Sequence, residues 1–513
     1  MNIFKDRFSE IKKASEPLYK SPKSVQETIE ILKISESGIF EVADGKYSRT
    51  YRFSDVNYAT RSEEEQESFF QRYCRCLNSF DCTFKITVNN KNKDMDVLRN
   101  EVMLKYRNDG FDKMRESYNR IIKEKILEGR QGIEQERYLT ITIERKNFEE
   151  AKAQFATIEA SMFRSFAELG SKLTPLTGNE RLKILHDYYR LGREDEFNFD
   201  IRHGRITGTD FRNEICNTRI KYHPDYFEDE GKVGRVLFIK KYPTYLSDRF
   251  FTELTFLPVH SVTSVDVVPV PKDLTMKMLQ KKYLGIESDI IKQQRTRNRN
   301  NDFSSDISYA TRQKKKDIEE IMNNVRENDE SLYYVSVTMI VMADDRDELE
   351  SICETVDSIA KGAGCAVDTC MYKQREAVNT TLPIGVRQIE TMRTMLTQSL
   401  AVLMPFNVQE LCDRNGIYYG VNQISKNIIV GNRKKLLNGN GFIFGVSGAG
   451  KSFQAKMEMG SVLLSTDDNV IAVDPMNEYE DVTEKYNGTY INISTNTRNY
   501  INPMDHFLFL LHS

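Results

Sequence analysis

The sequence lacks an apolar run that could cross a membrane and an apolar stretch of signal-peptide length at its N-terminus. A membrane-spanning helix needs roughly 18 or more mostly apolar residues, and no segment of the 513-residue chain provides them. The first residues, MNIFKDRFSEIKKASEP, are charged throughout, whereas a secretory leader needs a continuous apolar centre. We therefore expect the chain to lie in the cytoplasm.

Signatures of metal sites and catalytic nucleophiles are missing as well. Among the 8 cysteines no two have the C-x2-C spacing of a zinc site, and the 6 histidines form no Ser/His/Asp or H-E-x-x-H arrangement. The net charge is only −3, so the composition gives no general sign of nucleic-acid binding. We expect reduced structural thiols and no structural metal.

The composition is that of a globular protein with several domains. Apolar residues make up 39% of the chain, and 28 Phe and 25 Tyr are available to build cores. The length fits roughly three or four domain-sized units. We place an N-terminal tail or helix at 1–35, a first α+β unit at 36–200, a second at 201–405, and a further domain at 406–513.

The first α+β unit is recognised by a strand, a charged helical arm, a second strand and a capped helix. The strand is expected at 82–88, the arm at 98–134 and the second strand at 138–143, where apolar residues alternate. Asn147, with a glutamate three residues later, opens an amphipathic helix that Gly170 ends.

The second unit repeats this layout. A strand at 262–269 precedes a charged arm at 271–330, and an alternating strand follows at 335–341. Asp345 then caps a helix, and a last strand is expected at 367–371. We infer two related ferredoxin-like-type units that form an N-terminal platform, although succession of strand and helix is common and the match also fits coincidence.

Four further features are expected outside these segments. The pattern predicts a β-hairpin over 39–53, a helix over 63–77, a helix over 391–403, and a strand pair at 417–421 and 428–430.

The second arm contains the most basic stretch of the chain. A single-strand nucleic-acid site would need stacking aromatic residues among the charges, and only Phe303 and Tyr309 are available. We therefore favour a solvated helical hairpin over a nucleic-acid patch. The basic residues are Lys292, Arg295, Arg297, Arg299, Arg312, Lys314, Lys315 and Lys316.

The strongest motif matches the phosphate-binding loop pattern G-x-x-x-x-G-K-[ST]. Small residues let backbone N–H groups point at a phosphate; Lys451 would supply charge to the β- and γ-phosphates, and Ser452 a hydroxyl to Mg²⁺. We expect a strand at 442–444 before the loop and a helix at 453–464 after it, the context that the motif requires. The candidate ATP-binding residues are Gly445, Val446, Ser447, Gly448, Ala449, Gly450, Lys451, Ser452 and Phe453.

Two more strands are expected after the loop, at 469–474 and 488–493. The first ends in Asp474, but Pro475 stands where the glutamate of an Asp-Glu pair would be expected, so we interpret 474–479 as a turn. Such turns lie at the ligand-binding edge of an α/β sheet. Glu478 in this turn is the nearest candidate for a catalytic acid beside Lys451.

Six segments in this order resemble the VirB-four class of conjugative type IV secretion ATPases, also called the TraC, TrbE or CagE type, in the form of Gram-positive conjugative elements. The resemblance covers the chain from about Gly38. The segments are LPIG at 382–385, LMPF at 403–406, GIYYGVN at 416–422, GVSGAGKSF at 445–453, DPMNEY at 474–479 and INPMD at 501–505.

The resemblance implies an α+β platform followed by the start of a RecA-like α/β motor that binds ATP and Mg²⁺. It implies a homo-oligomer, hexameric in the full-length family, which works with channel proteins at the cytoplasmic face of a membrane and contacts DNA transiently. Because the family's motor continues well beyond the loop, we interpret the chain as a C-terminally truncated form. A non-catalytic docking module and a DNA pump of the HerA or FtsK kind are the alternatives.

Overall fold

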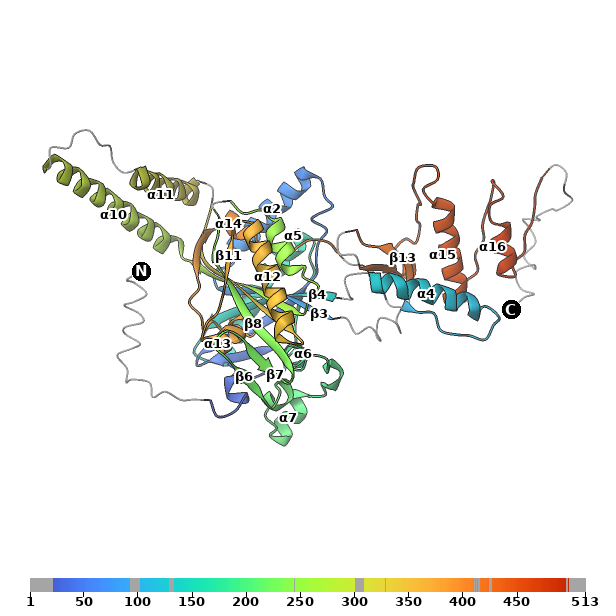
Figure 1. The fold of residues 1–513 in the computed structure, drawn as a ribbon, viewed down its shortest axis with the longest axis horizontal. Helices are drawn as coiled ribbons and strands as arrows, with labels where there is room; N and C mark the ends of the chain where they lie inside the picture. Colours follow the sequence, from blue (N-terminus) through green and yellow to red (C-terminus); the bar gives the residue numbers. More distant parts are fainter. Residues whose placement is uncertain are drawn as a thin grey trace. The chain divides into compact units, whose positions relative to one another are not determined.

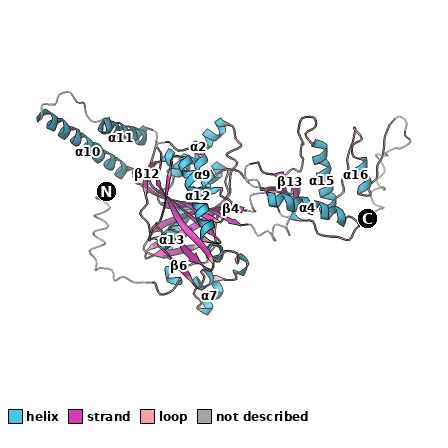
Figure 2. Ribbon diagram, viewed as in Figure 1, coloured by secondary structure: helices cyan, strands magenta, loops and turns pink. Residues whose placement is uncertain are grey.

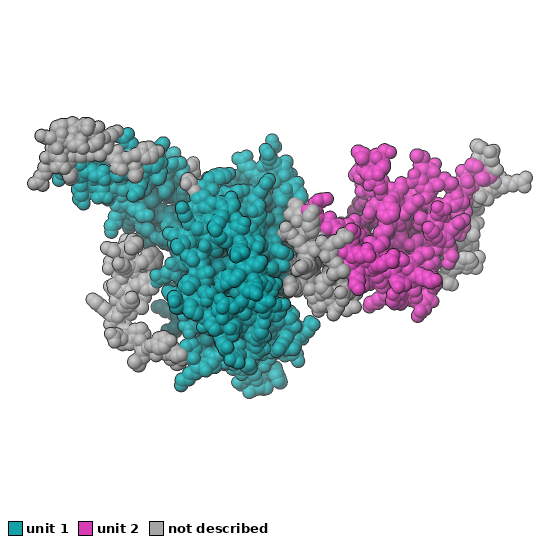
Figure 3. Space-filling view, viewed as in Figure 1, with its two compact units in different colours: residues 1–92, 133–409 teal, residues 93–132, 410–513 magenta. Residues whose placement is uncertain are grey.

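The computed structural model describes residues 22–92, 102–128, 133–243, 245–299, 309–327, 329–409, 411, 413, 416–423, 427–494 and 497. It is a mixed α+β structure with a large antiparallel sheet (Figures 1 and 2). The chain divides into two compact units (Figure 3). Unit 1 comprises Met1–Asn92 and Ile133–Gln409, and unit 2 comprises Lys93–Gly132 and Glu410–Ser513.

The division corrects one detail of the sequence-based boundaries. The sequence pattern places the arm at 98–134 in the first α+β unit, whereas Lys93–Gly132 belongs with the C-terminal residues in unit 2. The two predicted α+β units also share one sheet, in which all strand pairs are antiparallel.

Twelve strands form this sheet in the described part of unit 1. They are β1 (Ile39–Ala43), β2 (Lys46–Phe53), β3 (Thr83–Asn92), β4 (Ile133–Glu144), β5 (Leu173–Pro175), β6 (Ile220–Tyr222), β7 (Phe227–Asp229), β8 (Lys232–Lys241), β9 (Ser261–Val270), β10 (Leu332–Ala343), β11 (Ala366–Thr369) and β12 (Arg393–Leu396).

The helices of unit 1 include those that the sequence pattern predicts at 63–77 and after Asn147 and Asp345. They are α2 (Glu63–Asn78), α5 (Phe148–Leu169), α6 (Gly178–Tyr189), α7 (Ile201–Thr207), α8 (Arg212–Ile215), α9 (Arg249–Thr255), α10 (Lys272–Arg299), α11 (Tyr309–Glu327), α12 (Arg346–Gly362), α13 (Gln374–Thr381) and α14 (Thr397–Ala401), with short 3-10 turns at Gln26–Thr28 and Glu194–Glu196.

The strand order reveals a twofold repeat within the sheet. The main path is β1-β2-β4-β3-β9-β10-β8-β7-β6, with β5 beside β2 and β11 beside β8. Each half therefore runs strand, helix, strand, arm, strand, helix, short strand in sequence, and the two halves meet where β3 pairs with β9. At this junction the hydroxyls of Thr87 and Ser264, which are register partners, lie 2.8 Å apart. The matching layout inferred from the sequence is thus present in the strand order.

Capping residues begin the two equivalent helices where the sequence predicts, and Gly170 ends the first of them. Asn147 accepts a hydrogen bond from the Glu150 amide at 2.9 Å, and Gly170 ends α5 in the left-handed conformation with φ of 80°. Asp345 caps α12 in the same way at 2.8 Å from the Glu348 amide. The prediction of one helix over 391–403 is wrong in part. This segment forms the strand β12, which pairs with β10, and then the short helix α14.

Apolar clusters cover both faces of the sheet. Helices α2, α5, α9 and α12 contribute to the larger cluster, with Phe69, Phe155, Phe251 and Leu349 buried in it. Helices α6 and α13 contribute to the second cluster on other sheet side chains. Because both faces of the sheet are covered, β10 is buried along nearly its whole length. A strand in this position has mostly apolar residues on both of its faces.

The segments LPIG and LMPF brace this sheet. The carbonyl of Ile384 accepts a hydrogen bond from Ser48 at 2.6 Å, and the carbonyl of Pro405 accepts one from Arg137 at 2.7 Å. Arg137 also pairs with the buried Asp55 at 2.6 Å. Because buried carbonyls need donors, these contacts give both segments a structural role in unit 1.

Unit 2 contains a helix from the N-terminal half of the chain. Its elements are α4 (Asp112–Glu128), the hairpin strands β13 (Ile417–Val421) and β14 (Ile428–Gly431), a 3-10 turn at Arg433–Lys435, α15 (Lys451–Ser465) and α16 (Glu480–Lys485). Tyr118 and Ile122 of α4 pack with Ile428 and Val430 of β14. The strand pair predicted at 417–421 and 428–430 is confirmed.

Candidate functional site

The phosphate-binding motif forms a tight loop that leads directly into α15. Gly448 and Gly450 have φ angles of 80° and 86°, in the region that disfavours residues with a Cβ. The Ala449 amide donates to the Val446 carbonyl at 3.2 Å, and the Gln454 amide donates to Gly450 at 2.9 Å as the helix begins. The motif therefore places glycine where the backbone conformation requires it.

Lys451, the first residue of α15, folds back over the loop. Its Nζ lies 2.8 Å from the Gly445 carbonyl oxygen and 3.0 Å from that of Val446. The ammonium group now donates to neutral carbonyls, and an anion at the loop would give it a partner of opposite charge. The side chain is thus held near the loop centre by bonds that a phosphate can replace.

The N-terminus of α15 has no side-chain cap. Gly450 occupies the N-cap position and has no side chain that could accept a hydrogen bond, so the first N–H groups of the helix face outward with the positive end of its dipole. Ser452 and Phe453 in the first turn are exposed, and the Ser452 hydroxyl makes no hydrogen bond within the described residues. These features fit a phosphate group and a Mg²⁺-bound hydroxyl.

The predicted strands around the loop are wrong for the described residues. Segments 442–444, 469–474 and 488–493 pair with no strand there, and most of their apolar side chains are exposed, with Phe444 at 88% and Val473 at 93%. The rings of Phe442 and Phe444 stack at 5.8 Å, as expected of side chains two apart in an extended segment. A strand also needs a neighbouring strand with which to form hydrogen bonds. A short apolar run in the sequence does not show whether such a neighbour exists. The helix predicted at 453–464 is confirmed by α15.

Two arginines from the segment before and within α4 hold the other end of α15. Arg115 Nε donates to the Leu464 carbonyl at 3.1 Å, and Arg107 donates to the Ser465 carbonyl at 2.9 Å. Arg107 also pairs with Asp467 at 2.7 Å. Cations at a helix C-terminus satisfy its last carbonyls and oppose the negative end of the dipole.

The Arg115 side chain is almost completely buried, with 1% of it exposed. Its Nη1 lies 2.6 Å from Asp109 and 2.8 Å from Asp112. Hydrogen bonding by this guanidinium holds the pKa of Asp109 well below its usual range, and the amide of Arg107 is the largest cause of the lowered pKa of Asp112. The loop helix is therefore fixed to α4 by a charged network.

A second network connects the middle of α15 to the segment before the loop. Glu458 accepts a hydrogen bond from Tyr419 of β13 at 3.1 Å and pairs with Arg433 at 2.7 Å. The Arg433 guanidinium lies so close to Gly441 that a Cβ there would be 3.0 Å from it. Glycine at 441 leaves room for the arginine that ties this segment to α15.

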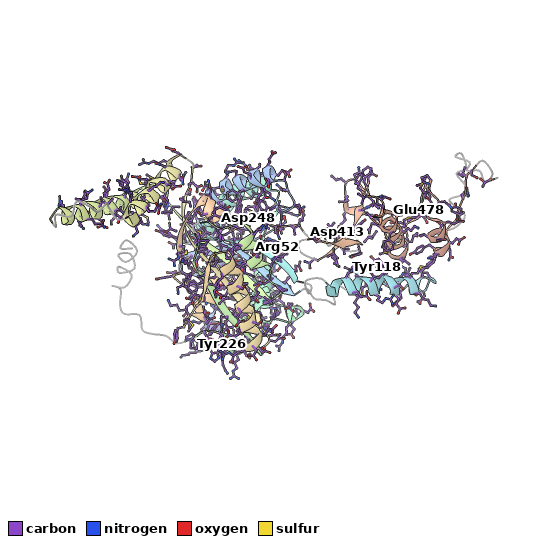
Figure 4. All side chains as sticks on the ribbon, turned by 45° about the horizontal axis from the view of Figure 1, so that its top comes forward. Arg52, Tyr118, Tyr226, Asp248, Asp413 and Glu478 are labelled. Atoms are coloured by element: carbon purple, nitrogen blue, oxygen red, sulfur yellow. The ribbon has the colours of Figure 1, made fainter. Side chains whose placement is uncertain are left out.

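Asp474 has a local structural role. Its carboxylate accepts hydrogen bonds from the amides of Met476 at 3.2 Å and Tyr479 at 2.9 Å, which closes the turn. The interpretation of 474–479 as a turn is confirmed. Glu478, labelled in Figure 4, is exposed in this turn, and no described contact joins it to the loop.

The basic arm of unit 1 forms the predicted helical hairpin, α10 against α11 (Figure 1). Lys315 pairs with Glu287 across the two helices at 3.0 Å and lies over the Tyr283 ring. Phe303 lies outside the described residues, as do Cys412 and the INPMD segment.

Sequence reasoning located the loop but missed the residues that position it. Arg107, Arg115 and Arg433 carried no sequence signal, because the residues of α15 that they contact lie far away in the chain. The cysteines of the described residues are unpaired, and burial raises their pKa values, for Cys74 to about 12.

No helix in the described part of the chain is long and apolar enough to cross a membrane.

No protein-family model matches the chain, and no curated protein matches it.

Proposed function

We propose that residues 445–452 bind ATP with Mg²⁺. The observation that supports this most strongly is the combination of two left-handed glycines, Gly448 and Gly450, with an uncapped helix start and Lys451 folded onto the loop carbonyls. Backbone N–H groups gathered at a helix N-terminus are a general site for phosphate. In this proposal Lys451 contacts the β- and γ-phosphates and Ser452 provides a hydroxyl to the metal ion.

In the wider proposal, the chain is the ATP-binding motor subunit of a conjugative type IV secretion system. Its ordered motifs resemble that class, and ATP hydrolysis there would be coupled to channel assembly or to transfer of DNA or protein. The subunit would work as a homo-oligomer with channel proteins at the cytoplasmic face of the membrane. A RecA-like motor and a ferredoxin-like description of the platform belong to this proposal.

Titration of a fluorescent ATP analogue with Mg²⁺ into the wild-type chain and Lys451→Ala tests the binding site. Loss of a charge-assisted contact worth ~1.5–3 kcal/mol should weaken binding at least about tenfold. Lys434→Ala is the matched control, because it removes an exposed lysine of unit 2 that pairs with Asp468 away from the loop. Equal affinities of the wild type and Lys451→Ala would refute the assignment.

The second candidate function is a docking module that binds ATP without hydrolysing it. Both carboxylate oxygens of Asp474 accept backbone amides that close its own turn, and Glu478 is exposed to solvent. Under this proposal phosphate release by the chain does not exceed that of Lys451→Ala. Steady release that disappears in both Lys451→Ala and Glu478→Gln would instead assign Glu478 as the catalytic acid.

A further inference from the structure

A solvent-open hollow of about 910 Å³ lies between α4 and the segment before it in unit 2. One wall is the solvent face of α4, where residues three or four apart share one side. The other wall is the segment that contains Lys105 and Tyr106. The side chains that matter here are Lys105, Tyr106, Lys113, Glu116, Arg120 and Lys123.

The walls of the hollow are fixed relative to each other. Asn119 of α4 accepts a hydrogen bond from the Leu104 amide at 2.8 Å and donates one to the Leu104 carbonyl at 2.9 Å. On the opposite face of α4, the buried Tyr118, which is labelled in Figure 4, and Ile122 pack against β14. The α4 wall of the hollow therefore belongs to a helix that is fixed on both of its faces.

The charge of the hollow is strongly positive. Four cations and one acid, Glu116, line it, whereas the whole chain has a net charge of −3. Within the described residues, none of these five groups takes part in an ion pair. The nearby carboxylates of Asp109 and Asp112 are occupied by Arg115. Glu124 follows Arg120 by one turn and lies outside the lining.

We propose that this hollow binds single-stranded nucleic acid. Lys113, Arg120 and Lys123 extend over about 15 Å of helix, at 1.5 Å per residue, which offers a backbone track for successive phosphates. Tyr106 is 61% exposed and gives an aromatic face on which an unpaired base can stack. A flat lipid surface fits a concave site poorly, and the paired bases of a duplex cannot reach such a ring.

This inference is independent of the proposed ATP site, because it uses no residue of the phosphate-binding loop. The test is fluorescence anisotropy of a labelled oligothymidine of about 16 nucleotides, measured on the full chain between about 50 and 200 mM salt. Four cations predict a slope of log K against log salt of about −2.8, since each phosphate contact contributes about −0.7 for single strands.

Lys113→Gln combined with Arg120→Gln should reduce that slope by about 1.4 and weaken binding at low salt about tenfold or more. The matched control is Lys281→Gln with Lys282→Gln, which removes the same charge from exposed positions of α10. It should bind as the wild type does. A loss as large in this control would show non-specific attraction and overturn the site.

Tyr106→Ala should weaken binding about fivefold or more, because one stacked base contributes about 1–3 kcal/mol. Lys451→Ala should bind oligothymidine as the wild type does, which separates this inference from the ATP proposal. Circular dichroism and urea unfolding establish that each variant is folded. Unchanged binding in Tyr106→Ala, no binding of oligothymidine by the wild type, or capture of phosphatidylserine vesicles in its place would each overturn the assignment.

Discussion

Arg115 gives the sharpest prediction about how the phosphate-loop helix is held. Arg115→Met keeps the apolar stem but removes the donors to Leu464, Asp109 and Asp112. Breaking a buried charge network costs about 3–5 kcal/mol. Because the side chains of Asp109 and Asp112 remain 37% and 27% exposed, water can replace part of the lost contacts, and we expect about 2–3 kcal/mol.

Amide hydrogen exchange measured by mass spectrometry reports this change directly. If α15 opens together with unit 2, a loss of 2–3 kcal/mol raises exchange of its amides by about 30- to 150-fold. Lys113→Met, two residues away on the exposed face of α4, is the control and should leave exchange in α15 nearly unchanged. Unaltered exchange over Lys451–Ser465 in Arg115→Met would show that the guanidinium does not hold this helix.

Two further predictions concern unit 1. Gly38→Ala should destabilise it by about 2 kcal/mol or more, because a Cβ at φ of 79° would lie 2.0 Å from the Leu176 carbonyl oxygen. Gly170 is also left-handed but has open space around it, so Gly170→Ala should cost only about 1–2 kcal/mol. Equal losses of stability in urea unfolding would contradict the clash at Gly38. Burial lowers the pKa of His260 to about 4, so between pH 6.5 and 4 the unfolded chain binds more protons than the folded chain does. The free energy of unfolding therefore falls with falling pH, by at most about 3 kcal/mol from this group. The His260→Leu variant should lose less stability over that range, and an identical pH profile would exclude the contribution.

Local rules predicted much of unit 1. The caps at Asn147 and Asp345, the stop at Gly170 and the alternation in β4 and β10 depend on neighbours within a few residues. The equivalent order of elements in the two halves could be inferred for the same reason. That β3 and β9 join the halves into one sheet depends on contacts far apart in the chain, which periodicity does not encode.

Unit 2 shows the limits of such reasoning. The loop was found because Gly448 and Gly450 are required by local backbone geometry. The apolar run at 442–444 has the composition of a buried strand, yet in the described residues it has no ladder partner, and its side chains are exposed. The role of α4 was missed for a related reason: Arg115 and Leu464 are distant in sequence, and their hydrogen bond leaves no local pattern.

The most direct test of the account is hydrogen exchange over the loop with and without ATP and Mg²⁺. We predict slower exchange in peptides that cover Gly445 to Phe453 when the nucleotide is present, because phosphate oxygens would accept bonds from amides that are now open. In Lys451→Ala this protection should disappear at the same nucleotide concentration. No protection at the loop of the wild-type chain, or equal protection in Lys451→Ala, would contradict the proposed ATP site.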